Sequence, residues 1–80
     1  MSLRILIKPE EISNWITRRS AQPARRRGTD AEYCLLFDTP PADCETLTMD
    51  DFLTGLRLNH QVLMVDEDPG KTFHRFVPRA

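Results

Sequence analysis

Arginine is the residue type whose spacing most directly predicts chemistry here. Five arginines lie within ten residues, namely Arg18, Arg19, Arg25, Arg26 and Arg27. Guanidinium groups bind phosphate oxygens, so this segment could contact a nucleic acid backbone. Trp15 lies one helical turn before Arg18 and could stack on a base. We therefore take Trp15 and the five arginines as candidate contacts for nucleic acid or a protein partner. The alternative is a solvated surface in an arginine-biased chain.

The charges are unevenly distributed along the 80 residues, although the formal net charge is only −1. Residues 1–29 have seven basic and two acidic groups, a net charge of +5, whereas residues 30–70 have one basic and ten acidic groups, a net charge of −9. Residues 71–80 add three basic groups. One protomer's basic segment could therefore meet another's acidic surface, while the acidic part would repel nucleic acid. The alternative is that folding mixes these charges in space.

The cysteines and histidines do not have the spacing of a metal site. Nine residues separate Cys34 from Cys44, and thirteen separate His60 from His74, whereas structural zinc sites use close pairs. We therefore expect no metal and two free thiols. A Cys34–Cys44 bridge is the alternative.

No motif predicts catalysis. Cys44 could form a nucleophile–base pair with either histidine, but no local signature supports it. The three glycines are isolated, which excludes a glycine-rich phosphate loop. The acidic residues 66–68 lead into a Pro-Gly turn rather than a calcium loop. We therefore predict a protein that is not an enzyme and needs no cofactor.

Apolar runs and capping residues predict the elements that must position these side chains. Strands are expected within residues 3–8, 32–38, 61–66 and 72–77. A helix is expected from about Pro9 to Ser20. A second helix is expected after the N-cap Thr48, ending at Asn59 in the left-handed conformation. Residues 21–30 contain Pro23 and Gly28 and predict a mobile, arginine-rich loop.

This order, βαβαββ, predicts one small α/β (or α+β) domain over residues 1–80. A four-stranded mixed sheet would carry two helices, because β-helix-β crossovers make parallel neighbours. Strand order 2-1-3-4 would place the helices on opposite faces, and we prefer it. Order 1-2-3-4 would place both helices on one face and leave an apolar face bare.

The predicted order resembles a small thioredoxin-like core without its last helix. Redox members of that class carry a reactive cysteine at the start of the first helix. This chain has Lys8-Pro9-Glu10-Glu11 there, so the resemblance implies no redox activity.

The small size of the chain and its incompletely covered sheet favour association over catalysis. No apolar run approaches the ~20 residues of a membrane span, and the first residues contain no signal peptide. We therefore expect a cytoplasmic protein without a membrane partner. We predict a non-enzymatic interaction or regulatory module that homodimerises or docks on a protein partner. A regulator that binds nucleic acid through residues 18–27 is the alternative.

Overall fold

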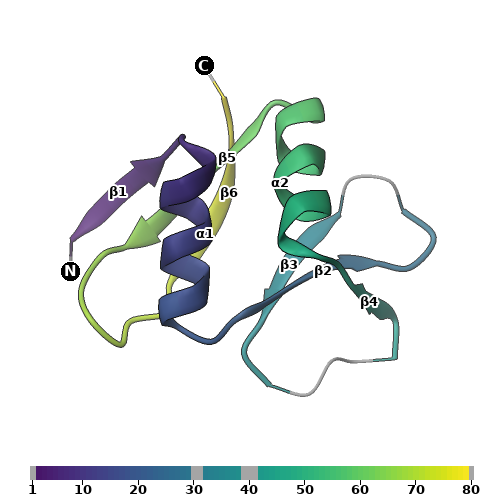
Figure 1. Cartoon of the computed structure of the whole chain (residues 1–80), viewed down its shortest axis with the longest axis horizontal. Helices are drawn as coiled ribbons and strands as arrows, with labels where there is room; N and C mark the ends of the chain where they lie inside the picture. The colour runs from purple at the N-terminus through teal and green to yellow at the C-terminus, as the bar shows by residue number, and fades with distance from the viewer. Residues whose placement is uncertain (1, 30–31, 39–41, 80) are drawn as a thin grey trace.

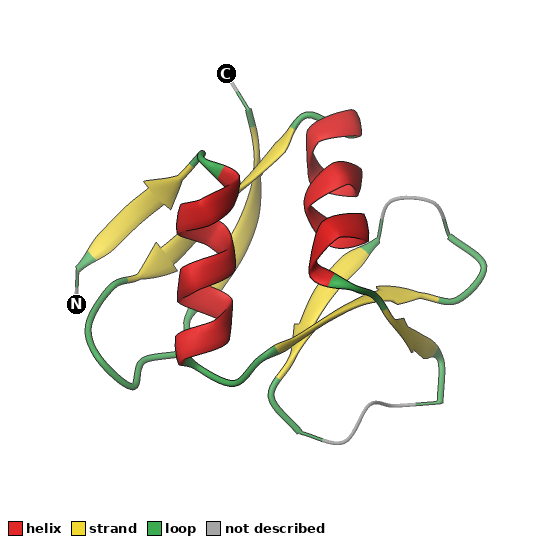
Figure 2. Cartoon of the chain, viewed as in Figure 1, coloured by secondary structure: helices red, strands yellow, loops and turns green. Residues whose placement is uncertain are grey.

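The computed structural model describes residues 2–29, 32–38 and 42–79 and shows a small α+β domain (Figure 1). Within the described part, two helices and six strands follow one another along the chain (Figure 2). They are β1 (Leu3–Leu6), α1 (Pro9–Arg18), β2 (Gln22–Arg26), β3 (Tyr33–Leu36), β4 (Cys44–Thr46), α2 (Met49–Leu58), β5 (Gln61–Asp66) and β6 (His74–Pro78).

The strands form two three-stranded sheets, ordered β1-β5-β6 and β3-β2-β4, in which every neighbouring pair is antiparallel. The predicted four-stranded mixed sheet is therefore wrong, and so is the resemblance to a thioredoxin-like order. The predicted sheet is wrong because an additional strand, β2, follows α1 and pairs with β3 rather than with β1. Because α1 leads into a separate sheet, it is not a crossover between parallel strands.

The prediction of a loop over residues 21–30 is wrong for β2, which is the central strand of its sheet. Pro23 indicated a loop because proline cannot donate a ladder hydrogen bond. In the structure its carbonyl accepts from the Leu47 N–H at 2.9 Å, one residue after β4 ends. A strand residue presents its N–H and C=O to the same side. The missing proline N–H therefore faces the end of β4, where the Leu47 carbonyl accepts a hydrogen bond from the Gln22 side chain at 3.0 Å instead.

The predicted helices are confirmed, with corrections at their ends. Thr48 caps α2, since its side chain accepts from the Asp51 N–H at 3.1 Å. Asn59 is not left-handed, with φ −97°; His60 takes that conformation instead, with φ 54°. The Gly55 carbonyl accepts from the Asn59 side chain at 2.9 Å and from the Asn59 backbone N–H at 3.0 Å, so Asn59 caps the helix through hydrogen bonds and not through a left-handed conformation.

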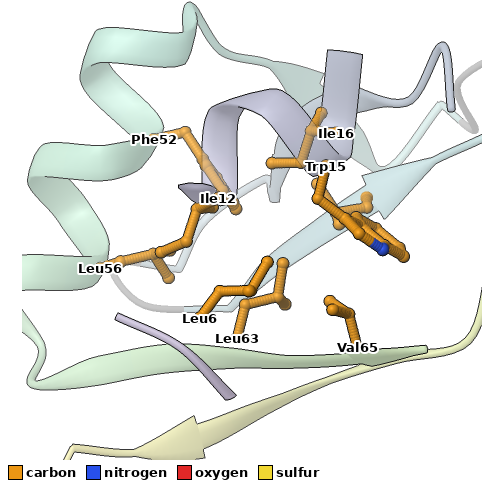
Figure 3. Close-up of a cluster of buried hydrophobic side chains, with 9 residues drawn as sticks. Leu6, Ile12, Trp15, Ile16, Phe52, Leu56, Leu63 and Val65 are labelled. Atoms are coloured by element: carbon orange, nitrogen blue, oxygen red, sulfur yellow. The ribbon is translucent and has the colours of Figure 1, made fainter. Parts of the chain in front are cut away.

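The core lies between the helices and the β1-β5-β6 sheet. Ile12, Trp15 and Ile16 point inward from α1, and Phe52 and Leu56 do so from α2 (Figure 3). They pack on strand side chains that point toward the helices, which are Leu6, Leu63 and Val65. Both helices therefore cover the same face of this sheet, and the preferred arrangement with helices on opposite faces is wrong.

Candidate functional site

Trp15 is a buried anchor in the structure rather than an open stacking platform. Its side chain is only 5% exposed, and its Nε1 donates to the Asp66 carbonyl at 3.0 Å. The Arg19 guanidinium carbon lies 4.4 Å from the ring centroid, a cation–π arrangement. A nucleic acid base could reach this ring only by displacing Arg19.

Arg19 connects the end of α1 to the turn between β5 and β6. It donates to the carbonyl oxygens of Asp66 at 3.2 Å and Asp68 at 2.9 Å. It also donates to the Lys71 carbonyl. These bonds occupy its guanidinium with backbone groups of a segment about 50 positions away. Arg19 therefore has a stabilising role that its position in the arginine cluster did not reveal.

Three of the other candidate arginines, Arg25, Arg26 and Arg27, lie beyond the α1–β2 connection, on β2 or directly after it. Arg25 pairs with Glu45 across β2 and β4. Arg26 lies 3.5 Å from Glu32 and 3.8 Å from Asp43. Two of the five cations thus meet acidic side chains.

Arg27 and Arg18 complete the set. Arg27 donates from Nε to the Ala42 carbonyl at 3.1 Å. Arg18 is exposed at the end of α1. The charges that are segregated along the sequence are therefore mixed in space at β2 and β4, as the alternative interpretation expected.

The face of the β1-β5-β6 sheet opposite the helices is the most distinctive surface. Leu6, Leu63 and Phe76 form one cross-strand row, and this row packs with the core. Since side chains alternate along a strand, the neighbouring row of Ile5 and Met64 points the other way.

We call this surface the open face; it comprises the apolar residues Leu3, Ile5, Ile7, Met64 and Val77 and the exposed cation Arg75, which lies opposite Met64. Its β1 side is the most exposed, with Leu3 at 50% and Ile5 and Ile7 each at 51%. α1 lies in front of the sheet in Figure 1, whereas the open face points away from the viewer. No helix or strand of the described residues covers it.

β1 is also an edge strand, because its neighbour in the sheet is β5 alone. An edge strand presents unpaired backbone N–H and C=O groups along its outer side. Exposed apolar side chains and an unpaired backbone edge therefore coincide on the same four-residue strand. Sequence reasoning treated this run as buried on both faces, since periodicity could not show that both helices pack on one side.

The two cysteines are brought together, which their sequence spacing did not predict. Cys34 and Cys44 lie on strands that flank β2, and their Sγ atoms are 3.9 Å apart as free thiols. Burial, and secondarily the contact with Cys44, raises the pKa of Cys34 to about 11. Cys34 is therefore protonated at neutral pH, which disfavours a nucleophilic role.

Within residues 2–29, 32–38 and 42–79, no three side chains of His, Cys, Asp or Glu form a group that could hold a metal ion.

Comparisons with models of known protein families, with curated proteins and with solved structures give no match. Neither described helix is long and apolar enough to cross a membrane. Any function must therefore be argued from the surfaces of this chain alone.

Proposed function

We propose that this protein is a non-enzymatic interaction module that acts as a homodimer through the open face and the β1 edge. The observation that carries the proposal is the exposure of about half of each large apolar side chain along β1 and just after it, at Leu3, Ile5 and Ile7. Contiguous apolar surface of this kind is typical of protein–protein contact sites.

A second copy of the chain is the occupant that this geometry favours. Two β1 strands can pair antiparallel around a two-fold axis, which would join two three-stranded sheets into one of six strands. Such an interface is isologous, so each protomer contributes the same edge and the same side chains. The pairing would satisfy the backbone groups at the β1 edge.

The free energy gained by burying the exposed apolar side chains is consistent with reversible association. Complete burial of an isoleucine or leucine side chain is worth about 1.5–3 kcal/mol. Burying the exposed half therefore contributes about 1 kcal/mol per side chain. Three such side chains from each protomer must offset the loss of translational and rotational freedom. We therefore expect a dimer whose population depends on concentration rather than a permanent one.

The test is sedimentation velocity over a concentration series. The wild-type protein should shift from the 9.3 kDa of one chain toward twice that mass as concentration rises. Ile5→Lys places a charge in the centre of the open face without touching the core, and should remain monomeric.

Leu58→Lys is the matched control, because Leu58 is also a large apolar residue and is even more exposed, at 65%, but lies on α2. This variant should dimerise like the wild type. A wild-type protein that stays monomeric at millimolar concentration, or an Ile5→Lys protein that dimerises normally, would refute the proposal.

A further inference from the structure

A groove with apolar walls lies at the end of the molecule where α1 begins and α2 ends. In Figure 1 this is the upper end, close to the start of β5 and the C-terminus. The groove holds about 260 Å³, and its apolar walls include Ile7, Ile12, Leu53 and Leu56. We call it the helix-end groove. It lies mainly on the helix side of the sheet and adjoins the open face at Ile7 and Val62.

The charged residues that line the helix-end groove all have the same sign. They are Lys8 before α1, Arg57 in the last turn of α2 and Arg79 after β6. None of the three side chains forms an ion pair or side-chain hydrogen bond with another described residue. Among the residues that the structure describes, no acidic side chain lines the groove.

A second groove, beside Trp15, shows the contrasting case. Its walls include both cations and carboxylates. Arg4 there lies 2.6 Å from Glu11 and 3.1 Å from Glu67, so its charge is already neutralised within the fold. The helix-end groove instead combines apolar walls with three cations that have no carboxylate partner in the described chain.

One polar atom in the helix-end groove also lacks a partner. The Gln61 Oε1 atom is buried and accepts no hydrogen bond from any described residue. Gln61 begins β5 and lines the groove. A buried acceptor without a donor is unfavourable, and a ligand carrying a hydroxyl or N–H group could provide that donor.

We propose that the helix-end groove binds a small carboxylate with an apolar body and a hydrogen-bond donor. The apolar body would lie between α1 and α2, and the carboxylate would face Lys8, Arg57 and Arg79. The volume limits the size of the ligand. Benzene fits an engineered cavity of about 150 Å³ in another protein, whereas drug-sized ligands occupy ~300–1,000 Å³. A body of about eight carbon atoms fits between these limits.

The test is a titration of ¹⁵N-labelled protein, followed by amide chemical shifts, with octanoate and 3-hydroxyoctanoate. Octanoate should shift amides of the groove residues saturably, with a dissociation constant of about 1 mM or lower. 3-Hydroxyoctanoate should bind more tightly than octanoate, because its hydroxyl can donate to Gln61 Oε1. Octan-1-ol and acetate should each bind at least about tenfold more weakly, since one lacks the charge and the other lacks the apolar body.

Three variants locate the site. Arg57→Gln and Arg79→Gln should each weaken octanoate binding by about tenfold, the loss expected for one charge-assisted hydrogen bond. Arg75→Gln is the matched control, because it removes the same charge from the exposed part of β6 outside the groove. Its affinity for octanoate should equal that of the wild type.

Several outcomes would overturn the inference. One is the absence of saturable amide shifts up to about 10 mM octanoate. Another is an equal affinity for octanoate and octan-1-ol. The third is a set of amide shifts confined to the open face. The Ile5→Lys protein should bind octanoate normally. The groove can therefore fail while the dimer is confirmed, or the reverse, because the two surfaces are tested by separate variants.

Discussion

Gly55 in α2 provides the sharpest test of how α2 packs against the β3-β2-β4 sheet. Glycine in a helix costs about 1 kcal/mol relative to alanine, so sequence alone predicts that Gly55→Ala stabilises the protein. The structure predicts the opposite. A Cβ atom at Gly55 would lie 2.1 Å from the Tyr33 Oη and 2.5 Å from its Cζ. These are clashes, because Tyr33 on β3 reaches over the helix backbone at this position.

The destabilisation expected for Gly55→Ala follows from the contacts that the Tyr33 ring would lose. Its ring packs edge-on against Phe52, with centroids 5.9 Å apart at an interplanar angle of 83°. Overpacking of this kind costs about 1–3 kcal/mol, and loss of the aromatic contact costs about 0.5–1.5 kcal/mol. After subtracting the helix gain of about 1 kcal/mol, we expect Gly55→Ala to lower the free energy of unfolding by about 0.5–3.5 kcal/mol.

Urea denaturation followed by the fluorescence of Trp15, the chain's one tryptophan, measures this change at fixed protein concentration. Tyr33→Leu removes the obstructing ring, so in that background Gly55→Ala should stabilise by about 1 kcal/mol. The difference between the two backgrounds is the coupling energy of a double-mutant cycle. If Gly55→Ala stabilises the otherwise wild-type protein, the close approach of Tyr33 to α2 does not exist as described.

Two further predictions concern ionisable groups. The Asp66 carboxylate accepts hydrogen bonds from the backbone N–H groups of Asp68 at 3.0 Å and Ser2 at 3.3 Å, and these lower the pKa of Asp66. A carboxyl with a lowered folded-state pKa stabilises the protein above its unfolded pKa of about 3.9. Asp66→Asn should therefore be less stable than wild type at pH 6, and this difference in stability should shrink as the pH falls below about 4. Urea titrations at several pH values measure it. A difference that does not depend on pH would contradict the lowered pKa of Asp66. The pKa of Cys34 near 11 predicts that its alkylation by iodoacetamide, followed by peptide mass spectrometry, rises about tenfold per pH unit from pH 7 to 10; a plateau above about pH 9 would show an ordinary thiol.

Local sequence signals located most elements because they act over a few residues. The Thr48 cap, the proline at the start of α1 and the turn around Gly70 each depend on neighbouring residues. The turn is confirmed by the Lys71 N–H to Asp68 carbonyl bond at 3.2 Å and by φ +77° at Gly70. Strand β4 was missed because three residues contain too little pattern. Strand β2 was missed because Pro23 and three arginines resemble a loop.

The candidate contact residues were predicted less well than the elements. Arginine spacing identified a cationic segment, but it could not show that Arg25 and Arg26 face acidic side chains brought in by β3 and β4. Those contacts join residues that are 6 to 20 positions apart. Likewise, Trp15 was predicted as a surface on which a base could stack, whereas its ring is buried, lies under Arg19 and donates to the Asp66 carbonyl.

The sequence by itself determined where the two helices lie, how α2 begins, and that the chain has four of its six described strands. Helix caps, turns and apolar periods are short-range, so each depends on residues within one or two turns. Only the tertiary structure decided which strands pair, that both helices share one face, and that an apolar face and a cationic groove remain exposed. Strand pairing joins residues as distant as Leu3 and Asp66. No local pattern specifies the partner of a strand, because every exposed edge offers the same backbone groups.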